Sequence, residues 1–368
     1  MKIAILYGGK SGEHEVSLVS ASSIIRAIPE ALHSIVAIGI AKDGTWYLQG
    51  DDLVKKVRSD ANAHLSIVRD ESKRVSVVPG GGPKGAFTAG GKPLPVDVAF
   101  PVLHGTFGED GTIQGLFEMA DVPYVGGGVL ASSVSMDKEK TKIVWQAAGL
   151  PVVPFVAIKR GDWKNAERRT AAIAKAEREL SWPMFVKPAC AGSSVGAAKA
   201  SDRKELETRA AEAFAWDDKI LIEPFIPARE IECSVTGNDD PVAYTPGEII
   251  PTHEFYDYEA KYTDPDGASL RIPADIDEGE TRKVRQMAVD AYKSLDVSGL
   301  SRVDFFIDKR NGALYLNEIN TIPGFTSISM FPKMCGASGL PYADLVMRLV
   351  DLALERHDAR NALRTSRE

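Results

Sequence analysis

The sequence predicts a mixed fold, in which an N-terminal α/β domain with an open parallel sheet precedes α+β units. Its 368 residues suggest two or three domains, since one domain usually takes about 150 residues. The first part of the chain alternates apolar runs with helical patterns, as parallel sheets do. From residue 184 onward, short strand patterns become more frequent, which is typical of α+β domains.

The N-terminal domain is predicted from alternating strands and helices. An apolar run at 2–7 ends in two glycines, as a buried parallel strand ends before a ligand-facing loop. A helical pattern follows at 16–32, and a second apolar run at 95–103 leads into another helix. Ligands of such sheets bind beyond the carboxyl ends of the strands. The segment 41–95 is rich in Gly and Pro and predicts hairpins with a mobile loop.

Two further units follow. Ser135 is a candidate N-cap for a helix that ends at Ala148, before Gly149. The other elements expected up to residue 223 are helices at 162–180 and 202–214 and strands at 184–187, 195–200 and 220–223. The last unit should contain strands at 230–236 and 242–250, a polar-aromatic loop at 252–270, a helix at 278–295, a hairpin at 302–320 and a helix at 342–357.

Composition excludes several classes of protein. No stretch of about 18 apolar residues is present, so a membrane span is not expected. The N-terminus lacks the pattern of a signal peptide, and three widely spaced cysteines indicate free thiols in a reducing cytoplasm. The net charge of -7 argues against nucleic acid as a partner. We therefore expect a cytoplasmic enzyme with no membrane and no nucleic-acid partner.

The predicted hairpin concentrates polar side chains. Arg302 and Asp304 share one face of their strand, as Glu318 and Asn320 share a face of theirs, because residues two apart point the same way. A two-residue turn would separate Asp304 from Glu318. A three-residue turn with Gly312 in the left-handed conformation would place Asp304 opposite Glu318, and we favour this turn. Carboxylates and a carboxamide would then suit Mg²⁺, although a solvated face with one salt bridge is the alternative.

A second candidate site follows a strand that ends in Lys187. The small residues that come next, from Ala189 to Gly196, could cradle phosphate through backbone amides and the hydroxyls of Ser193 and Ser194. The lysine precedes the glycines, so this is not a P-loop. An ordinary hairpin turn is the alternative. Lys138 could add a second cationic contact, although alone it is better explained as a solvated lysine.

Three other loops could contribute to a site. The segment 252–262 carries three tyrosines, a phenylalanine and a lysine, which suits a lid or a hairpin packed on its aromatics. Glu15 and His104 lie in loops expected at the carboxyl ends of parallel strands. Glu15 could pair with a ligand ammonium, whereas His104 alone is better explained as a turn histidine that bonds the backbone.

Together these segments resemble the D-alanine–D-alanine ligase family of ATP-grasp enzymes over nearly the whole chain. The motifs that carry the resemblance, in chain order, are GEHEVS (12–17), LHGTFGEDGTIQG (103–115), SMDKEKTK (135–142), VKPACAGSSVGAAK (186–199), FYDYEAKY (255–262), RVDFF (302–306) and LNEINTIPGFTSISMFP (316–332). The resemblance implies a three-domain ATP-grasp architecture, with domains at 1–134, 135–215 and 216–368. The two α+β domains would clamp ATP.

The implied reaction joins two D-alanines. ATP phosphorylates the carboxylate of the first, the amine of the second attacks the acylphosphate, and ADP and phosphate are released for peptidoglycan precursor synthesis. The implied cofactors are ATP and two Mg²⁺ or Mn²⁺ ions, and the family leads us to expect a homodimer. The alternatives are a related ligase that uses D-serine or D-lactate, and a nucleotide-binding regulator that has lost catalysis.

The resemblance also implies individual residue roles. The ATP-binding residues would be Lys138 and Lys187 (phosphates), Ser193 and Ser194 (phosphate loop), Glu223 (adenine amino group), Phe225 and Ile226 (backbone strap), Glu230 (ribose) and Lys261 (γ-phosphate). The metal ligands would be Asp304, Glu318 and Asn320. The residues around the amino acids would be Glu15 (ammonium of the first D-alanine), His104, Arg302 and Gly324 (oxyanion), and Ser329 and Met330 (carboxylate of the second). Ser193, Tyr262 and Glu15 would form a bridge that closes the lid, and Tyr262 favours D-alanine over D-lactate.

Overall fold

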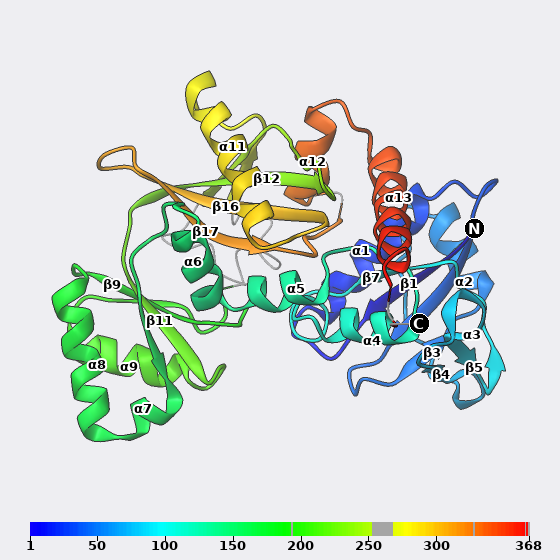
Figure 1. Cartoon of the computed structure of the whole chain (residues 1–368), viewed down its shortest axis with the longest axis horizontal. Coiled ribbons are helices and arrows are strands. Elements are labelled where there is room, and N and C mark those ends of the chain that lie inside the picture. Colours follow the sequence, from blue (N-terminus) through cyan, green and yellow to red (C-terminus); the bar gives the residue numbers. More distant parts are fainter. Residues whose placement is uncertain (193, 252–267, 327, 365, 367–368) are drawn as a thin grey trace.

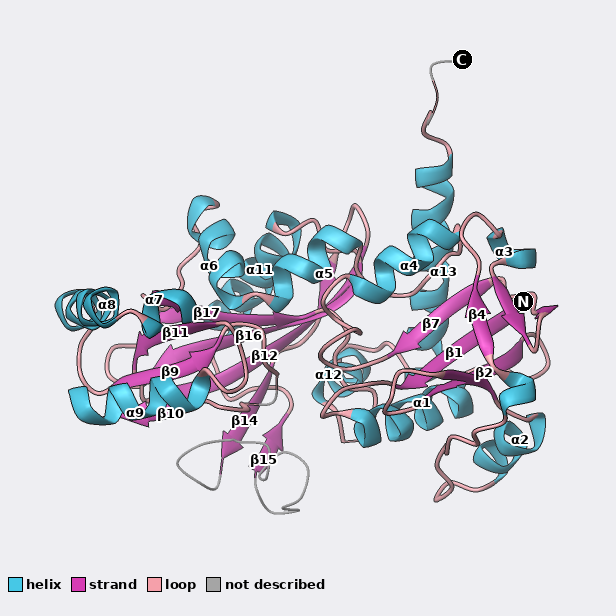
Figure 2. Cartoon of the chain, turned by 90° about the horizontal axis from the view of Figure 1, so that it is seen from below, coloured by secondary structure: helices cyan, strands magenta, loops and turns pink. Residues whose placement is uncertain are grey.

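The computed structural model describes all 368 residues except 193, 252–267, 327, 365 and 367–368. Three sheets of four, four and six strands, with a small three-stranded sheet beside the first, organise the described part of the chain. The N-terminal sheet lies at one end of the molecule, and the two other large sheets lie together at the opposite end (Figures 1 and 2). The mixed α/β and α+β fold class is therefore confirmed.

The N-terminal sheet has the strand order β3-β2-β1-β7. Its central strand β1 pairs in parallel with both β2 and β7, while β3 is antiparallel to β2. The parallel core of the sheet was predicted from the buried apolar runs. The bounds are β1 Lys2–Gly8, β2 Ser34–Ile40, β3 Trp46–Leu48 and β7 Val98–Val102, with helices α1 His14–Ala27, α2 Asp51–Ser59 and α4 Thr112–Ala120.

The Gly/Pro-rich segment forms the expected hairpins. The antiparallel order β4-β5-β6 makes a small sheet beside the edge of the N-terminal sheet. Phe87 of β5 is buried against Phe117 of α4, so this small sheet adds to the N-terminal core. The bounds are β4 Val75–Val77, β5 Phe87–Ala89 and β6 Lys92–Pro93, with the short helices η1 Glu71–Lys73 and α3 Gly82–Gly85.

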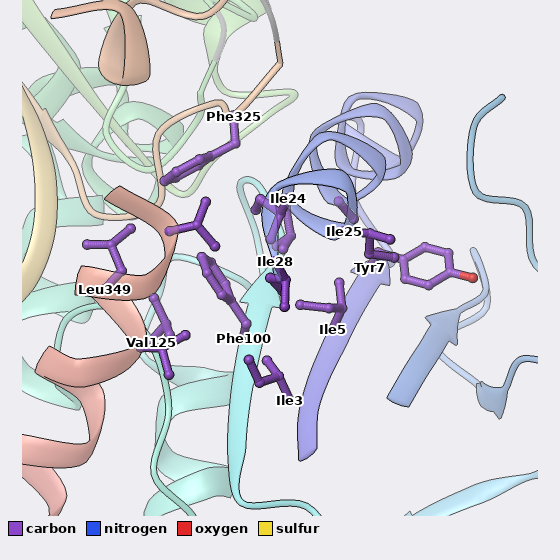
Figure 3. Packing of buried hydrophobic residues seen from close by; sticks show 14 of the residues in the cluster. Ile3, Ile5, Tyr7, Ile24, Ile25, Ile28, Phe100, Val125, Phe325 and Leu349 are labelled. Atoms are coloured by element: carbon purple, nitrogen blue, oxygen red, sulfur yellow. The ribbon is translucent and has the colours of Figure 1, made fainter. Parts of the chain in front are cut away.

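The C-terminal helix α13 (Tyr342–Asn361) packs on the N-terminal sheet, against α1 and β7 (Figure 1). Leu349 of this helix shares one buried apolar cluster with Ile5, Phe100 and Phe325 (Figure 3). Phe325 meets Phe100 edge-on, with the ring centroids 6.2 Å apart. The end of the chain thereby fixes the segment around Phe325 to the carboxyl ends of the N-terminal strands.

Two short helices link the N-terminal sheet to the rest. The expected cap at Ser135 is wrong, because Ser135 lies inside helix α5 (Val129–Met136). Asp137 instead caps helix α6 (Lys138–Ala147), and its carboxylate accepts from the backbone N–H groups of residues 139 and 140. A carboxylate is an effective N-cap because it satisfies free amides and favours the helix dipole. Lys138 thereby becomes the first residue of its helix.

The central sheet is antiparallel, with strand order β10-β9-β11-β8. The helix predicted over 162–180 is instead two helices, because Asn165 ends the first and its side chain caps the second. The bounds are β8 Val156–Lys159, β9 Met184–Pro188, β10 Ala198–Ala200 and β11 Lys219–Pro224, with α7 Arg160–Lys164, α8 Ala166–Glu179 and α9 Arg203–Ala213.

The C-terminal sheet has the order β15-β14-β12-β16-β17, and β13 pairs with β12. Helix α11 packs on β12 and β16, and α12 packs on β12. The bounds are β12 Ala228–Gly237, β13 Val242–Ala243, β14 Gly247–Pro251, β15 Ala268–Arg271, β16 Gly299–Asp308 and β17 Leu314–Asn320, with α11 Glu278–Ser294 and α12 Met330–Ala337. No helix among the described residues has the length and apolarity to cross a membrane.

The hairpin of β16 and β17 corrects one prediction and confirms another. The backbone N–H of Asp308 donates to the carbonyl of Ala313 at 2.9 Å, so the turn contains four residues rather than the favoured three. Gly312 has the expected left-handed conformation, with φ of 73°. Asp304 nevertheless lies opposite Glu318, because the register shifts between 304 and 305 and leaves one extra residue in β17.

Candidate active site

The central and C-terminal sheets enclose a cavity of about 430 Å³. Strands β9 and β11 supply one wall, and strands β12, β16 and β17 supply the other. Ten of the residues expected to bind nucleotide, metal or oxyanion line it, namely Lys138, Lys187, Ser194, Glu223, Phe225, Ile226, Glu230, Arg302, Asp304 and Glu318. These residues come from four of the motifs named above and from the segment 223–230, and the fold brings them together.

Glu223 lies in the wall of this cavity, between two lysines. Its Oε1 is 2.8 Å from the Nζ of Lys142, and its Oε2 is 2.9 Å from the Nζ of Lys187. Burial alone would raise the pKa of Glu223, but the two ammonium groups lower it overall, so the carboxylate is ionised. The sequence-based prediction missed Lys142, although it belongs to the SMDKEKTK motif.

Lys187 is the last residue but one of strand β9, lies in the cavity wall and is almost fully buried. Besides its ion pair with Glu223, its Nζ donates to Oδ1 of Asn317 at 3.2 Å. Asn317 is the extra residue that the bulge introduces into β17. The bulge therefore contributes a partner for Lys187, which the alternation of residues along a regular strand could not predict.

The expected metal ligands lie together on the hairpin. Both side-chain nitrogens Nε and Nη2 of Arg302 donate to the carboxylate of Asp304, each at 2.7 Å. The amide of Asn320 also donates to Oδ2 of Asp304, at 3.0 Å. Glu232 on β12 lies opposite Asp304 and 3.1 Å from Arg302. Arg302 thus pairs with two carboxylates of the acidic patch. The expected grouping of Arg302, Asp304, Glu318 and Asn320 on the hairpin is confirmed.

Lys138 connects the hairpin to the glycine-rich loop. Its Nζ donates to the carbonyl of Ala191 at 2.9 Å and lies 3.3 Å from Glu318. Its backbone N–H donates to the carbonyl of Ala189 at 3.0 Å. Only 13 % of the Lys138 side chain is exposed, so the alternative of a solvated lysine is wrong. The ammonium group is placed where it could meet an anion bound between the loop and the hairpin.

A smaller hollow next to the main cavity leads toward the N-terminal sheet. It shares Lys138, Ala191 and Glu318 with the main cavity, and it is also lined by Asn320 and by the loop after β7. The N-terminal loop therefore approaches the hairpin face that carries the expected metal ligands. Such a position lets one ligand contact groups from both ends of the molecule.

Glu109 in the loop after β7 is a further residue that the sequence-based prediction missed. Its carboxylate accepts from the backbone N–H of Gly105 at 2.8 Å and of Ile322 at 3.0 Å. It thereby joins the N-terminal loop to the segment after β17. Burial, with a smaller contribution from the charge of Glu13, raises the pKa of Glu109 to about 8. Its place within LHGTFGEDGTIQG was the available signal, since acidic side chains in Gly-rich loops often bond backbone amides.

His104 bonds internal partners. Its Nδ1 lies 3.0 Å from the carbonyl of Ile322, which can only accept, so Nδ1 carries the proton. Nε2 then accepts from Ser20 at 3.2 Å. Burial lowers the pKa of His104, which keeps the ring neutral. These contacts match the alternative of a histidine that bonds the backbone.

Glu15 lies in the first turn of α1, at the carboxyl edge of the N-terminal sheet. Its side chain is 69 % exposed, and its Oε1 is 2.6 Å from the Nζ of Lys42. The hydrogen bond from Lys42 lowers the pKa of Glu15, so the group is an ionised carboxylate that already accepts an ammonium. It does not line either of the two cavities among the described residues.

Gly324 and Ser329 lie close together in the segment after β17. A Cβ added to Gly324 would come 2.8 Å from the Oγ of Ser329, so the serine side chain would have to move. The Oγ of Ser329 accepts from the backbone N–H of Thr326 at 3.0 Å. Met330 begins helix α12 and is buried. Three other expected residues, Ser193, Lys261 and Tyr262, lie outside the described residues.

Both halves of the chain match family models. The D-ala D-ala ligase N-terminus matches residues 2–127, and the D-ala D-ala ligase C-terminus matches residues 144–351. The D-alanine–D-alanine ligase of Treponema denticola is 61% identical over 368 residues, with 100% of both chains covered. The D-alanine–D-alanine ligase A of Escherichia coli is 45% identical, with 100% of this chain and 99% of that protein covered.

Solved structures agree with the sequence comparisons. The D-alanine–D-alanine ligase of Coxiella burnetii has a TM-score of 0.82 at 36% identity, with 98% of this chain and 96% of that chain covered. A D-Ala:D-Ser ligase of Enterococcus faecalis has the same TM-score and identity, with 96% of this chain and 99% of that chain covered. The C-terminal match includes every residue that lines the cavity described above except Lys138, and the chain belongs to the D-alanine–D-alanine ligase family.

Proposed function

We propose that this chain joins two D-alanine molecules at the expense of ATP and releases D-alanyl-D-alanine, ADP and phosphate. The observation that carries the proposal is the cavity between the central and C-terminal sheets, where two lysines, two hairpin carboxylates and an arginine converge. Such a group of charges suits a nucleotide triphosphate and the charge that moves during phosphoryl transfer. The product would supply peptidoglycan synthesis in the cytoplasm.

The nucleotide would lie along β11 and β12. Glu223 would accept a hydrogen bond from the adenine amino group, and the backbone of Phe225 and Ile226 would contact the ring. Glu230, which also lines the cavity, would bind the ribose hydroxyls. Lys187, which also pairs with Glu223, and Lys138 would bind phosphate oxygens, together with the loop that contains Ser193 and Ser194. Lys261 would reach the γ-phosphate.

The hairpin would hold two Mg²⁺ or Mn²⁺ ions through Asp304, Glu318 and Asn320. Carboxylate and carboxamide oxygens are the hard donors that these ions prefer. Among the described residues no three His, Cys, Asp or Glu side chains gather around a common point, so phosphate oxygens would have to complete the coordination. When bound, the ions supply neutralisation of phosphate charge.

The amino acids would bind between the N-terminal loops and the segment after β17. Glu15 would bind the ammonium of the first D-alanine, with His104 nearby, and the bridge of Ser193, Tyr262 and Glu15 would close the site. The acylphosphate forms when the carboxylate oxygen of the first D-alanine attacks the γ-phosphorus and ADP leaves.

The second amine then attacks the carbonyl carbon, and a tetrahedral oxyanion develops. Arg302 and the backbone N–H of Gly324 would stabilise this charge, while Ser329 and the N–H of Met330 would hold the second carboxylate. Collapse of the intermediate breaks the bond to the phosphate and leaves the new amide. A group positioned for the developing charge is worth about 10²–10³ in rate.

A D-alanine–D-serine ligase is the second candidate function. A structure with that name matches this chain as well as the D-alanine–D-alanine ligase of Coxiella burnetii does, by TM-score and identity. The similarity of the folds therefore does not distinguish D-alanine from D-serine as the second substrate. The higher identity to the Treponema denticola relative supports D-alanine, and the presence of Tyr262 argues against D-lactate.

The deciding experiment measures ADP release by the purified chain with ATP and Mg²⁺, after addition of D-alanine, L-alanine or neither. We expect release with D-alanine alone. Chromatography of products formed with D-serine or D-lactate as competitors would identify the second substrate. ATP binding without substrate-dependent ADP release would instead indicate a regulator that has lost catalysis.

Two organisational features accompany this proposal. The working units would be 1–134 for the first D-alanine, and 135–215 with 216–368 for ATP, the lid being 252–270. The enzyme would act as a homodimer, which analytical ultracentrifugation of the purified chain can test.

A further inference from the structure

Lys142 is a buried cation that the proposed reaction does not use. It lies on α6, and its side chain has no exposed surface. Burying an ammonium group costs several kcal/mol unless partners compensate for the lost water. The contacts of a lysine in such a position must therefore compensate for the loss of water around its charge.

Those contacts centre on Glu223. The Nζ of Lys142 lies 2.8 Å from Oε1 of Glu223 and donates to the carbonyl of Val153 at 3.4 Å. The ring of Phe155 lies 5.9 Å from the same nitrogen, at cation–π distance. The other charged groups that act on Lys142 are Lys187 and Glu318. Burial lowers the pKa of Lys142 to about 8, which still leaves it mostly protonated at neutral pH.

The two lysines that pair with Glu223 differ in their access to the cavity. Lys187 and Glu223 line the cavity, whereas Lys142, among the described residues, does not. When Lys187 turns to a nucleotide phosphate, its ion pair with Glu223 weakens. Lys142 cannot reach a phosphate in the cavity, so it still neutralises and orients the carboxylate of Glu223. Without it, binding of the phosphates would leave a buried carboxylate uncompensated.

We propose that Lys142 is a positioning residue that keeps Glu223 as an ionised acceptor aimed at the nucleobase, and so sets the preference for a 6-amino purine. This inference rests on the proposed role of Glu223. An ionised carboxylate can only accept hydrogen bonds. It pairs with the amino group of adenine and repels the carbonyl oxygen at the same place in hypoxanthine.

The experiment compares binding of ADP and IDP, with Mg²⁺, to the whole chain by titration calorimetry. Lys142→Met preserves much of the side chain's length but removes the charge. We expect it to lower the ratio of ADP to IDP affinity by about tenfold or more, the equivalent of one hydrogen bond to a charged group. Lys140→Met, on the exposed side of the same helix, is the matched control and should keep the wild-type ratio.

The possible results separate the roles. Equal loss of ADP and IDP affinity in Lys142→Met would assign Lys142 a structural role only and overturn the inference. If the wild type itself binds ADP and IDP equally, Glu223 does not recognise the adenine amino group, and the inference about Lys142 is overturned as well. The proposal that the chain ligates D-alanine would not be affected by that result. Lys142→Gln, which keeps a donor for Glu223, is measured in the same way if Lys142→Met does not fold, with a smaller fall in the ratio expected.

Discussion

Asp304 lies directly opposite Glu318 on the β16–β17 hairpin, and a bulge produces this pairing. The four-residue turn alone would place Asn317 opposite Asp304 and turn Glu318 to the other face. The extra residue shifts the register by one, so that both carboxylates share a face. It also places Asn317 beside Lys187. One local irregularity thus serves both the expected metal site and the phosphate-binding lysine.

Replacement of Glu318 should abolish turnover. Glu318→Ala removes one of two facing carboxylates, so the charge of the nucleotide phosphates would no longer be neutralised at this position. We expect ADP release below about 1% of the wild-type rate. Glu318→Asp keeps the charge and should retain more activity, particularly at high Mg²⁺. Activity of Glu318→Ala near the wild-type level would contradict the metal assignment.

Replacement of Arg302 should reduce both stability and rate. Arg302 pairs with Asp304 and Glu232, and all three side chains are at least four-fifths buried. Arg302→Ala removes this cation from two buried carboxylates, which costs about 3–5 kcal/mol in the free energy of unfolding. We also expect kcat to fall by about 10²–10³ through loss of oxyanion stabilisation.

Urea unfolding and steady-state kinetics measure the two effects separately. Arg282→Ala is the control, because its pair with Glu278 on α11 is exposed and should contribute almost nothing to stability. Arg302→Lys keeps a charge but loses the two parallel hydrogen bonds, so an intermediate result is expected. Wild-type stability in Arg302→Ala would show that the two carboxylates do not need this partner.

Stability should depend on pH through Glu109. Burial raises its pKa to about 8 in the folded chain, from an ordinary value of 4.5. Above pH 4.5 the unfolded chain releases this proton first, so the contribution of Glu109 to the free energy of unfolding falls as pH rises toward 8. Glu109→Gln cannot ionise, but it loses one acceptor for the two backbone N–H groups.

We therefore expect Glu109→Gln to be less stable than the wild type at pH 5, with a smaller difference at pH 8. Chemical unfolding at the two pH values gives the comparison. A difference that grows with pH would mean that Glu109 is ionised in the folded chain. Glu109→Gln also loses one hydrogen-bond acceptor, which lowers its stability independently of pH. The informative quantity is therefore the change with pH of the difference in the free energy of unfolding between the variant and the wild type.

Motifs with regular local geometry were predictable from sequence. The buried parallel strand at 2–7 and the shared faces of the hairpin follow from the periodicity of side chains along strands. The resemblance to a known family supplied the positions of the residues that line the cavity. Correct placement of Asp304 opposite Glu318 did not require the correct turn, because the extra residue in β17 compensated for it.

Other features depend on tertiary contacts that sequence patterns do not encode. The cap at Asp137 could be confused with Ser135, since both residues are good N-caps. Lys142 has the pattern of a helix-surface lysine, and only the packing of β11 against α6 shows that it is buried with Glu223. Glu109 likewise gains its partner Ile322 from a segment more than 200 residues away.

A methyl group at Gly324 should disturb the binding of the second amino acid. The added Cβ of Gly324→Ala would lie 2.8 Å from the Oγ of Ser329, so the serine must move. Because Ser329 is the proposed partner of the second carboxylate, we expect KM for the second D-alanine to rise by about tenfold or more, the value of one hydrogen bond to a charged group. Binding of ADP should be unchanged, because Gly324 lies outside the cavity that would hold the nucleotide.

Gly336→Ala on α12 is the matched control for this substitution. No atom lies within 4 Å of a Cβ added there, and alanine favours the helix by about 0.5–1 kcal/mol. This variant should keep the wild-type KM and gain slightly in melting temperature. Initial rates measured over a range of D-alanine concentrations separate the KM values of the two D-alanine binding sites, because binding at the first site does not involve Ser329. An unchanged KM in Gly324→Ala would place the second carboxylate elsewhere in the segment between β17 and α12.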